Sequence, residues 1–448
     1  MRITKHEESK RTKRTKIGKT AGSRRKVGSL ALAALLLGGM AAGCSIGKEQ
    51  AKQGSDYTTA YTAEDVDPSL AEGMNEFALN FYAMLEKQPG EDSPGPNRMV
   101  SPAGIAIALS MLKAGAEGQT DRELEQVLNL SGMNAEQLGA AQQVMRELLR
   151  GADPSIRMEI ANSFWSRQGF QLKPDYVKSL EQYYEAQARA LDFDSDKAAP
   201  TINAWISDNT AGKIRDVIKP PIDGDTVLFL INAMYFKGSW TEPFKAEQTG
   251  DLPFTTAEGE EIQVPTMKQR DKYDYLDADG FRAIRLPYGE SKNFGMILAL
   301  PDEGRTLEQF KRQDLPAFDT WSAELSRQEG SVELPKFKLE DSLSLNDALI
   351  ALGMPSAFDP SKAELGGIAD TGDRRLYVSK ASHDTFIEVN EEGTEAAAVT
   401  VIEGATSSAP VENKPFNLKL NRPFFFAITD RTTGLIVFMG EVGNPSES

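Results

Sequence analysis

The positions of apolar residues predict helices in the first part of the chain. Asp67 and Pro68 form a cap and first-turn pair. The apolar residues that follow recur at helical spacing: Leu70, Met74, Phe77, Ala78, Phe81 and Met84 or Leu85. The helical pattern continues over most of residues 105–144, where Gly115 and Gly118 interrupt it. This part of the chain is therefore predicted to be mainly helical.

Beyond Pro220 the apolar pattern becomes that of strands. Residues 227–236 form a continuous apolar run, which predicts a strand buried on both faces, and three later runs look similar: 294–300, 424–429 and 435–442. Val, Tyr, Phe and Ile come in near alternation over residues 375–390. No tandem repeat or low-complexity linker divides residues 68–444. We therefore predict one α+β domain, with helices first and sheets later.

The N-terminus has the pattern of an export signal. Residues 1–28 carry 11 Lys or Arg and two Glu, and a charge-free apolar run covers residues 27–42. This run is short for a membrane span of about 20 residues, but it suits the apolar region of a secretory signal. Small residues then precede the only cysteine, Cys44, and this arrangement resembles a bacterial lipoprotein signal. We therefore predict that residues 1–43 are removed and that Cys44 is lipidated.

Two alternatives for the N-terminus stay open: ordinary cleavage near residues 42–43, or an uncleaved anchor. The basic run at residues 23–26, Ser-Arg-Arg-Lys, also leaves open whether export uses the Sec or the twin-arginine route. Residues 44–67 are polar without an apolar period and are predicted to form a flexible tether. The expected location is the bacterial cell surface, as a membrane-anchored lipoprotein, or the extracellular space.

The charge of the chain limits its partners. Its 448 residues include 50 Lys and Arg against 66 Asp and Glu, a net charge of −16. Residues 1–43 hold 11 of the basic and two of the acidic residues, so the mature part has 39 basic and 64 acidic residues and a net charge of −25. Such a chain is not expected to bind nucleic acid, whose phosphates require clustered Lys and Arg. It would not bind anionic lipid by charge, so an acyl chain would have to hold it at a membrane.

Familiar catalytic and metal-binding motifs are missing from the sequence. There is no Gly-x-Ser-x-Gly turn, His-Glu-x-x-His motif or phosphate-binding Gly loop, and one Cys with two His excludes clusters of these ligands. Residues 277–280, Asp-Ala-Asp-Gly, lack the other ligands of a calcium loop and predict an ordinary turn. His383 lies in an apolar, strand-like stretch, which predicts a hydrogen-bonded structural role; the opposing interpretation is a hydrolase that uses His383. We predict no enzyme activity, no metal and no cofactor.

Residues 391–414 follow a predicted strand but consist largely of small side chains. When they are read at period two from Thr394, one face is small or apolar and the other carries two carboxylates. The first face is Thr394, Ala396, Ala398, Thr400 and Ile402, and the second is Glu395, Ala397, Val399, Val401 and Glu403. Composition alone leaves two interpretations open: a flexible surface loop, or a segment with one exposed and one sheet-inserted conformation.

The sequence around this segment resembles the serpin family. Residues 377–390, YVSKASHDTFIEVN, running into residues 391–398, EEGTEAAA, are similar to the family's hinge region. Further matches are spread along the chain, at residues 97–102 with 114–120, 202–205 with 210–214, 232–240, 334–337, 421–426 and 438–440. The resemblance covers essentially residues 68–444 and rests on several specific motifs.

The resemblance implies a metastable serpin fold with three β-sheets, eight to nine helices and an exposed reactive-centre loop at about residues 391–417. It implies a serine protease inhibitor that acts as a suicide substrate. The protease cleaves the loop, an acyl-enzyme forms, and the freed hinge inserts into the main sheet. The implied partner is a serine protease, or a cysteine protease as for some members, and the protein is expected to be a monomer. The alternative is a non-inhibitory serpin that acts as a binding protein or a simple protease substrate.

The resemblance also assigns residues to the mechanism. The hinge consists of Glu391, Gly393, Thr394, Glu395, Ala396, Ala397, Ala398 and Thr400. The polar residues beneath the sheet, where it opens, match Ser101, Asn232 and His383, and Trp240 matches the point where the hinge first enters. Gly104 stands where the family has a second serine, which predicts a thinner or water-filled network.

The scissile bond is placed by counting. The family's usual spacing from Glu391 puts it between Ser407 and Ser408. Counting back from the Asn-Arg-Pro-Phe motif puts it after Glu412 instead, because the far side of the loop is about five residues longer than is typical. Residues 405–407 are small, which favours an elastase-like or subtilisin-like target over a trypsin-like one. The glutamates near the bond leave a glutamyl-specific protease open.

Overall fold

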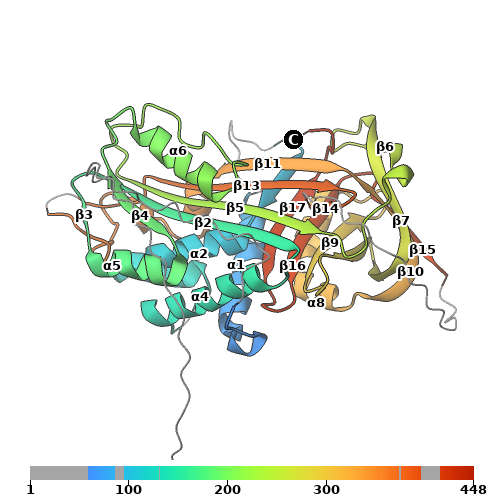
Figure 1. Ribbon diagram of the computed structural model, residues 1–448, viewed down its shortest axis with the longest axis horizontal. Helices are drawn as coiled ribbons and strands as arrows, with labels where there is room; N and C mark the ends of the chain where they lie inside the picture. Colours follow the sequence, from blue (N-terminus) through green and yellow to red (C-terminus); the bar gives the residue numbers. More distant parts are fainter. Residues whose placement is uncertain (1–58, 86–94, 131, 373–374, 395–413, 448) are drawn as a thin grey trace, which may run out of the picture. The chain divides into compact units, whose positions relative to one another are not determined.

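The computed structural model describes residues 59–85, 95–130, 132–372, 375–394 and 414–447. Within these ranges the chain forms three sheets and nine α-helices (Figure 1), so the predicted α+β class and the implied numbers of sheets and helices are confirmed. The helices are α1 (Pro68–Leu85), α2 (Pro102–Lys113), α3 (Gly118–Val127), α4 (Ala135–Gly151), α5 (Pro174–Ser179), α6 (Ala198–Asn209), α7 (Leu307–Gln313), α8 (Phe318–Ala323) and α9 (Asn346–Leu352). The strands are β1 (Asn97–Val100), β2 (Ile156–Arg167), β3 (Gln171–Leu172), β4 (Gln187–Leu191), β5 (Leu228–Ser239), β6 (Gly250–Thr255), β7 (Glu261–Ala278), β8 (Phe281–Pro287), β9 (Phe294–Pro301), β10 (Ser326–Pro335), β11 (Phe337–Ser344), β12 (Ala369–Asp370), β13 (Lys380–Asn390), β14 (Gly393–Thr394), β15 (Phe416–Lys419), β16 (Phe424–Asp430) and β17 (Ile436–Val442).

The main sheet has six strands in the order β11-β13-β14-β5-β2-β4. Its centre is a parallel contact of seven residue pairs between β13 and β5, from Lys380 opposite Phe229 to Phe386 opposite Tyr235. We call this contact the seam. β14 lies at one end of the seam and pairs antiparallel with both strands (Figure 1). The main sheet is therefore closed along the seam and opened by β14 at one end.

The second sheet has nine strands, in the order β1-β17-β16-β9-β8-β7-β10-β15 with β6 paired to β7. All residues of β9, β16 and β17 are buried, as their continuous apolar runs predict for strands covered on both faces. α2 packs against β5 of the main sheet and β17 of the second sheet, and all 12 of its residues are buried. Ser101 caps α2 and Pro102 occupies its first position. A helix buried between two sheets has no solvent face, which is why its sequence is apolar nearly all round.

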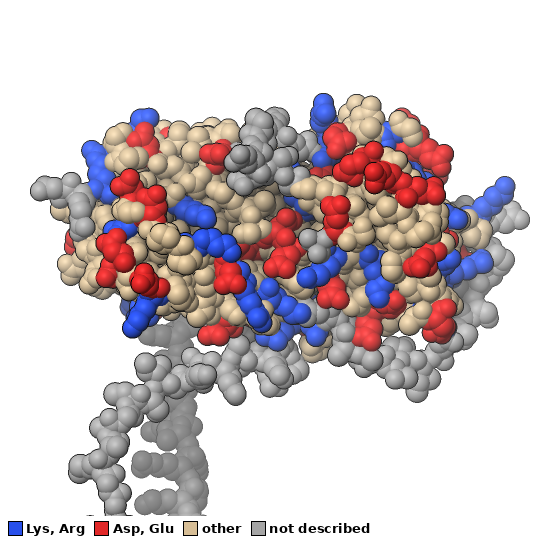
Figure 2. All heavy atoms as spheres, turned by 90° about the horizontal axis from the view of Figure 1, so that it is seen from above, with Lys and Arg blue, Asp and Glu red and all other residues tan. Residues whose placement is uncertain are grey.

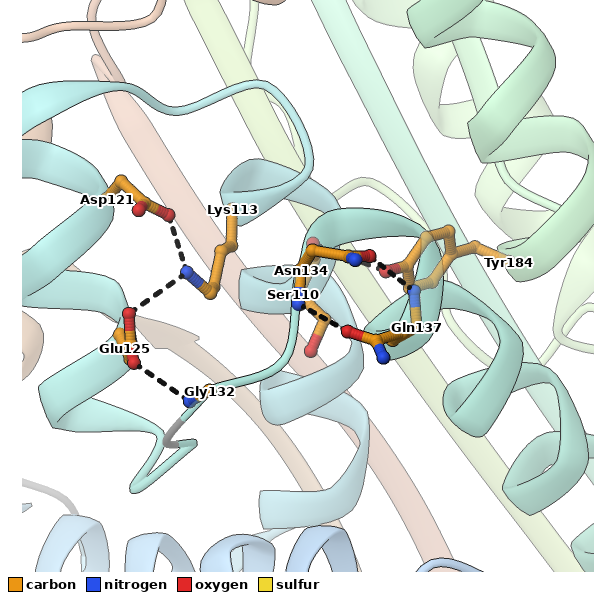
Figure 3. Close-up of polar contacts among 8 residues, drawn as sticks. All are labelled: Ser110, Lys113, Asp121, Glu125, Gly132, Asn134, Gln137 and Tyr184. Carbon is orange, nitrogen blue, oxygen red and sulfur yellow. Dashed lines mark hydrogen bonds and ion pairs between the residues drawn. The ribbon is translucent and has the colours of Figure 1, made fainter.

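The first helices are joined by polar contacts (Figure 3). Lys113, at the C-terminus of α2, is almost fully buried and forms ion pairs with Asp121 (2.5 Å) and Glu125 (3.7 Å) of α3. α4 begins with reciprocal hydrogen bonds between Asn134 and Gln137. A buried lysine is tolerated because its charge is paired, and these contacts fix α3 at the end of α2.

The predicted division into helices first and sheets later is only partly correct. β2 and β4 precede residue 220, and α7, α8 and α9 follow it. β2 is a central strand whose residues 160–166 are all buried, and Ala, Asn and Ser stand there among aromatic residues. Burial on both faces removes the alternation by which a strand is recognised.

The predicted signal at residues 1–43 and the predicted lipidation site Cys44 lie outside the described residues, as does the predicted tether up to residue 58. In the last part of that tether, Ala63–Asp65 form a short 3-10 helix that begins with a reciprocal cap between Thr62 and Asp65. Backbone structure therefore begins ahead of Pro68. None of the helices in the described ranges combines the length and the apolar character needed to cross a bilayer.

The turn predicted near Gly280 is confirmed. Asp279 and Gly280 connect β7 to β8, and Gly280 has φ 89°, a conformation that glycine adopts without strain.

The described part of the chain holds no group of three His, Cys, Asp or Glu suited to a metal ion. On the face shown in Figure 2, the described Lys and Arg side chains are interspersed with Asp and Glu side chains. That face does not present the single-sign surface that a phosphate backbone requires.

Candidate functional site at the seam

Ser101, Asn232 and His383 lie together on the side of the seam that faces α2. The backbone N–H of Ser101 donates a hydrogen bond to Nε2 of His383 (2.7 Å), and Nδ1 of His383 lies 2.6 Å from Oδ1 of Asn232. Because Nε2 accepts, the ring proton belongs on Nδ1, which donates to Asn232. His383 and Asn232 are opposite each other across the seam. This side-chain bond therefore joins β13 to β5.

The imidazole of His383 is completely buried, and burial lowers its pKa to about 3. The ring is therefore neutral at physiological pH, with both nitrogens engaged by hydrogen bonds within the protein. Neither nitrogen is free to take a proton from a substrate, which argues against a hydrolase that uses His383. The geometry describes a structural, hydrogen-bonded histidine.

Asn162 of β2 is a further member of this network that the sequence does not reveal. Its Oδ1 accepts a hydrogen bond from Nδ2 of Asn232 (2.7 Å), its cross-strand partner, and this bond turns the Asn232 oxygen toward His383. The hydroxyl of Ser101 donates to the carbonyl oxygen of Val437 in β17 (2.6 Å), which links the seam to the second sheet. We refer to Ser101, Asn162, Asn232 and His383 as the polar cluster.

Glycine at position 104 does not thin the polar cluster, contrary to the expectation from the sequence. A Cβ at Gly104 would lie 2.5 Å from Oδ1 of Asn232 and 2.7 Å from Cγ of Met234. The amide of Asn232 therefore occupies the space that a serine side chain would need. Glycine at this position allows Asn232 to reach His383.

Gly393 and Thr394 of the predicted hinge form β14 and are part of the main sheet. They pair with residues 389–390 of β13 and with residues 238–239 of β5. Gly393 has φ 147°, and a Cβ there would collide with the backbone of Gly238, so that only glycine fits. Thr394 is completely buried, and its hydroxyl lies 2.7 Å from the hydroxyl of Tyr288. The first residues of the expected loop are therefore held in the sheet.

Trp240 holds the backbone that leads into β14. Its indole N–H donates to the carbonyl oxygen of Asn390 (3.0 Å), and its backbone N–H donates to that of Glu392 (3.0 Å). The indole also stacks on Tyr288, with ring centroids 4.3 Å apart and an interplanar angle of 14°. The backbone N–H of Phe244 donates to the carbonyl oxygen of Glu391 (2.8 Å). Residues 240–244 therefore hold residues 390–392 by hydrogen bonds, and we call residues 240–244 the entry segment.

Glu391 at the base of the hinge is anchored by its side chain as well. It forms an ion pair with Lys336 (2.9 Å) and accepts a hydrogen bond from Thr249 (2.9 Å). Burial raises the pKa of Glu391, but the hydrogen bonds to its carboxylate outweigh burial and leave the pKa below its ordinary value. The base of the hinge is thus fixed to the junction between β10 and β11 and to the segment between β5 and β6. Glu395, Ala396, Ala397, Ala398, Thr400, Ser407 and Ser408 lie outside the described residues.

Comparison with known proteins identifies the family. The family model described as serpin (serine protease inhibitor) matches residues 72–445 of the chain. The chain belongs to the serpin family. The seam and β14 are therefore parts of a serpin main sheet, and the polar cluster joins this sheet to the start of α2.

Relatives of this serpin match over most of their length. Leukocyte elastase inhibitor of Xenopus tropicalis is 32% identical over 384 residues, which cover 84% of this chain and 100% of the relative. Antithrombin-III of Ovis aries is 35% identical over 385 residues, which cover 84% and 82%. Among solved structures, Serpin48 of Tenebrio molitor has a TM-score of 0.73 at 29% identity and covers 84% of this chain and 98% of its own. The native thermophilic serpin Tengpin has a TM-score of 0.72 at 28% identity, with coverage of 82% and 93%.

Asp384, the neighbour of His383 on β13, is a buried carboxylic acid on the opposite face of the strand. It accepts a hydrogen bond from the Ser342 hydroxyl (2.6 Å). Burial nevertheless raises its pKa to about 6, because the hydrogen bond and the attraction of Lys380 offset burial only in part. Folding therefore favours the protonated form, and the free energy of unfolding decreases as the pH rises from about 4 to 6.

We expect Asp384→Asn to stabilise this serpin at neutral pH. The amide keeps an acceptor for Ser342 but cannot ionise, so the variant should exceed the wild type by up to about 3 kcal/mol at pH 7.5 and by little at pH 4. Urea unfolding of both proteins at the two pH values measures this difference. Asp208→Asn, at an exposed position of α6, is the control and should change neither value. A stabilisation that is equal at both pH values would contradict the assignment to ionisation.

Proposed function

We propose that this serpin inhibits serine proteases by suicide-substrate trapping. One observation carries the proposal: Gly393 and Thr394 are already paired between β13 and β5, at the open end of a seam that is otherwise closed. A strand that continues from β14 would enter the seam directly. The family membership and the match to protease inhibitors support the same activity.

The register of β14 supports this path in detail. Thr394 pairs with Val389 of β13 on one side and with Gly238 of β5 on the other. When both antiparallel registers are continued along the sequence, position 400 falls opposite His383 on β13 and opposite Asn232 on β5. Insertion would therefore place Thr400 between these two side chains and break the hydrogen bond that closes the seam.

The alternation of the hinge residues supports insertion as well. On the same register, Ala396, Ala398 and Thr400 would share the buried side of Thr394. These side chains are small and carry no charge, so their burial lacks the penalty of an unpaired charge. The added strand would also form backbone hydrogen bonds along both of its edges. The burial of small uncharged side chains and the added backbone hydrogen bonds both favour insertion, and therefore trapping over simple cleavage.

The same register favours Ser407–Ser408 as the scissile bond over a cut after Glu412. A strand continued from β14 reaches the start of β5, Leu228, at residue 404. Ser407 would then lie just past the end of the sheet, whereas Glu412 would leave a further stretch without a strand to pair with. Insertion as far as Ser407 would carry the attached protease along the whole sheet.

The covalent step is ordinary acyl transfer up to the point of trapping. The hydroxyl oxygen of the protease serine attacks the carbonyl carbon of Ser407, and its proton passes to the base of the protease. The C–N bond to Ser408 breaks, the amine of Ser408 takes that proton, and Ser407 remains joined to the protease as an ester. Hydrolysis of this ester by water would release a cleaved, inactive serpin. Insertion must therefore be faster than hydrolysis.

The small residues before the bond favour an elastase-like or subtilisin-like target, and a cysteine protease would form the corresponding thioester.

We also propose that the mature protein begins at a lipidated Cys44 and is held at the bacterial surface, or is released from it. This proposal rests on the signal pattern at residues 1–43 alone. Mass spectrometry of the mature N-terminus tests it, because an unmodified N-terminus would exclude the lipid anchor.

Mixing the mature chain with pancreatic elastase, subtilisin, trypsin and a glutamyl endopeptidase tests the inhibitor proposal. We expect an SDS-stable band at the summed mass with elastase or subtilisin, and a released C-terminal peptide that begins at Ser408. Cleavage without such a band, but with a large rise in thermal stability, would indicate that insertion occurs but loses to hydrolysis. Cleavage without either change would overturn the mechanism and favour a binding or substrate role.

A further inference from the structure

A second side-chain contact crosses the seam, on the face opposite to that of the polar cluster. Phe386 of β13 and Tyr235 of β5 are directly opposite each other, and their ring centroids lie 6.3 Å apart. Both side chains are almost completely buried. Because side chains alternate along a strand, Phe386, three residues after His383, lies on the other face. The seam is therefore closed by a hydrogen bond on one face and by aromatic rings on the other.

Phe386 belongs to a core that is otherwise built across the seam from β13. This core, which we call the α6 core, consists of buried residues of β2, β5, α6 and the segments that flank α6. Among the described residues, Phe386 is the one side chain that β13 contributes to it. The ammonium of Lys213, in the segment after α6, also lies 5.0 Å from the centroid of the Phe386 ring, and that of Lys338 in β11 lies 5.3 Å from it. Phe386 thus joins β13 to elements on the other side of the seam.

Phe386 also lies where an inserting strand would first have to open the seam. Phe386 and Tyr235 form the last residue pair of the seam, next to β14. When the register of β14 is continued, position 397 falls between these two residues, and the sequence has alanine there. An inserted strand would separate β13 from β5 by one further strand spacing of about 4.8 Å. The Phe386 ring would then leave the α6 core, and the methyl group of alanine is too small to replace it.

We propose that Phe386 is a latch on the seam: a positioning residue whose ring holds β13 against β5 beside β14 and limits the rate at which the seam opens. The contacts of this ring with Tyr235, with Lys213 and with the α6 core exist only while the seam is closed. They therefore stabilise the closed state, from which the barrier to opening is measured, and weakening them should speed opening. The effect on trapping rests on the proposed function, but the closure of the seam does not.

Hydrogen exchange of the intact mature chain, without protease, tests the latch. Phe386→Val removes the ring but keeps a side chain suited to a strand. The amides that pair β13 with β5, within residues 380–386, should then exchange about fivefold faster or more. The matched control is Phe193→Val. Phe193 is a buried ring of the same core, with Phe229 beside it and Arg167 over its face, but both neighbours lie on its own side of the seam.

Both variants should unfold at lower urea concentration, because each loses a buried ring. Phe193→Val should nevertheless leave exchange along the seam within about twofold of the wild type, since its contacts do not cross the seam. Phe386→Leu, a smaller change, should give an intermediate increase and serves if the valine variant does not fold. Unchanged exchange in the Phe386 variants, or an equal increase in Phe193→Val, would overturn the latch and leave Phe386 as ordinary core packing.

The role of the latch in insertion is tested with a fluorescent peptide that has the sequence of residues 395–407. The peptide should enter the seam of Phe386→Val about fivefold faster than that of the wild type or Phe193→Val. Faster hydrogen exchange without faster entry of the peptide would overturn this role. A protein that shows the latch by hydrogen exchange but neither takes up the peptide nor traps a protease would contradict the proposed function alone, because the exchange experiment does not depend on insertion.

Discussion

Thr394→Arg is expected to convert this serpin from an inhibitor into a substrate. Thr394 is completely buried in β14, between β13 and β5, with its hydroxyl against Tyr288. An arginine there would bury a charge without a partner in the described surroundings, at a cost of several kcal/mol. Since each 1.4 kcal/mol changes a rate about tenfold, insertion should become slower than hydrolysis. The SDS-stable complex should fall more than tenfold while cleavage of the loop continues, as measured on denaturing gels.

Thr394→Val is the matched control for this variant. Valine keeps the size and branching of threonine and loses only the contact with the Tyr288 hydroxyl, which is worth about 1 kcal/mol. Trapping should therefore remain close to that of the wild type. An arginine variant that traps protease as well as the valine variant would show that position 394 is not buried in the sheet when the hinge inserts.

His383→Leu is expected to weaken the closed seam and to shorten the lifetime of the active protein. Leucine leaves the backbone N–H of Ser101 and the Oδ1 of Asn232 without their partner, and each buried group left in this way costs about 1 to 3 kcal/mol. The variant should unfold at lower urea concentration. It should also lose trapping capacity during incubation at moderate temperature, because the closed state loses stability relative to the inserted one. Urea unfolding and the number of active molecules over time measure these effects.

His383→Gln separates loss of hydrogen bonds from loss of the imidazole. A glutamine amide can accept from Ser101 and donate to Asn232, so this variant should retain more stability than His383→Leu at pH 7.5. Burial holds the pKa of His383 near 3, so folding favours the neutral ring and stability is lost as the pH falls from about 6.5 toward 3. Glutamine cannot ionise, so His383→Gln should lose less stability than the wild type over that pH range. If His383→Gln and His383→Leu had the same free energy of unfolding at pH 7.5, a hydrogen-bonding role for His383 would be excluded.

The apolar pattern predicts the strands of the second sheet well, because β9, β16 and β17 are continuous apolar runs in a fully covered position. It does not predict β2, whose Ala, Asn and Ser residues are buried through neighbours that come from distant parts of the chain. The polar cluster illustrates the same limit. The resemblance points to Ser101, Asn232 and His383, but Asn162 joins them only through the pairing of β2 with β5.

The state of the hinge is also a property of three-dimensional contacts. The two-faced alternation from Thr394 onward indicates a segment that can act as a strand, but it does not indicate that Gly393 and Thr394 are already paired. That pairing depends on Tyr288 and on the backbone of residues 238–244, which are more than one hundred residues away in sequence. The role of Gly104 is likewise set by the position of Asn232, which no spacing along the chain reveals.

The parallel register of the seam has a consequence for how this serpin should be quantified. An inserted strand would replace seven parallel pairs with two antiparallel ladders, and antiparallel pairing is slightly more stable per residue. Return to the starting arrangement would require all of these new contacts to break, so on the proposed mechanism each molecule would act in a single encounter. The potency of such an inhibitor would be described by an association rate constant and the number of intact molecules, and not by a dissociation constant.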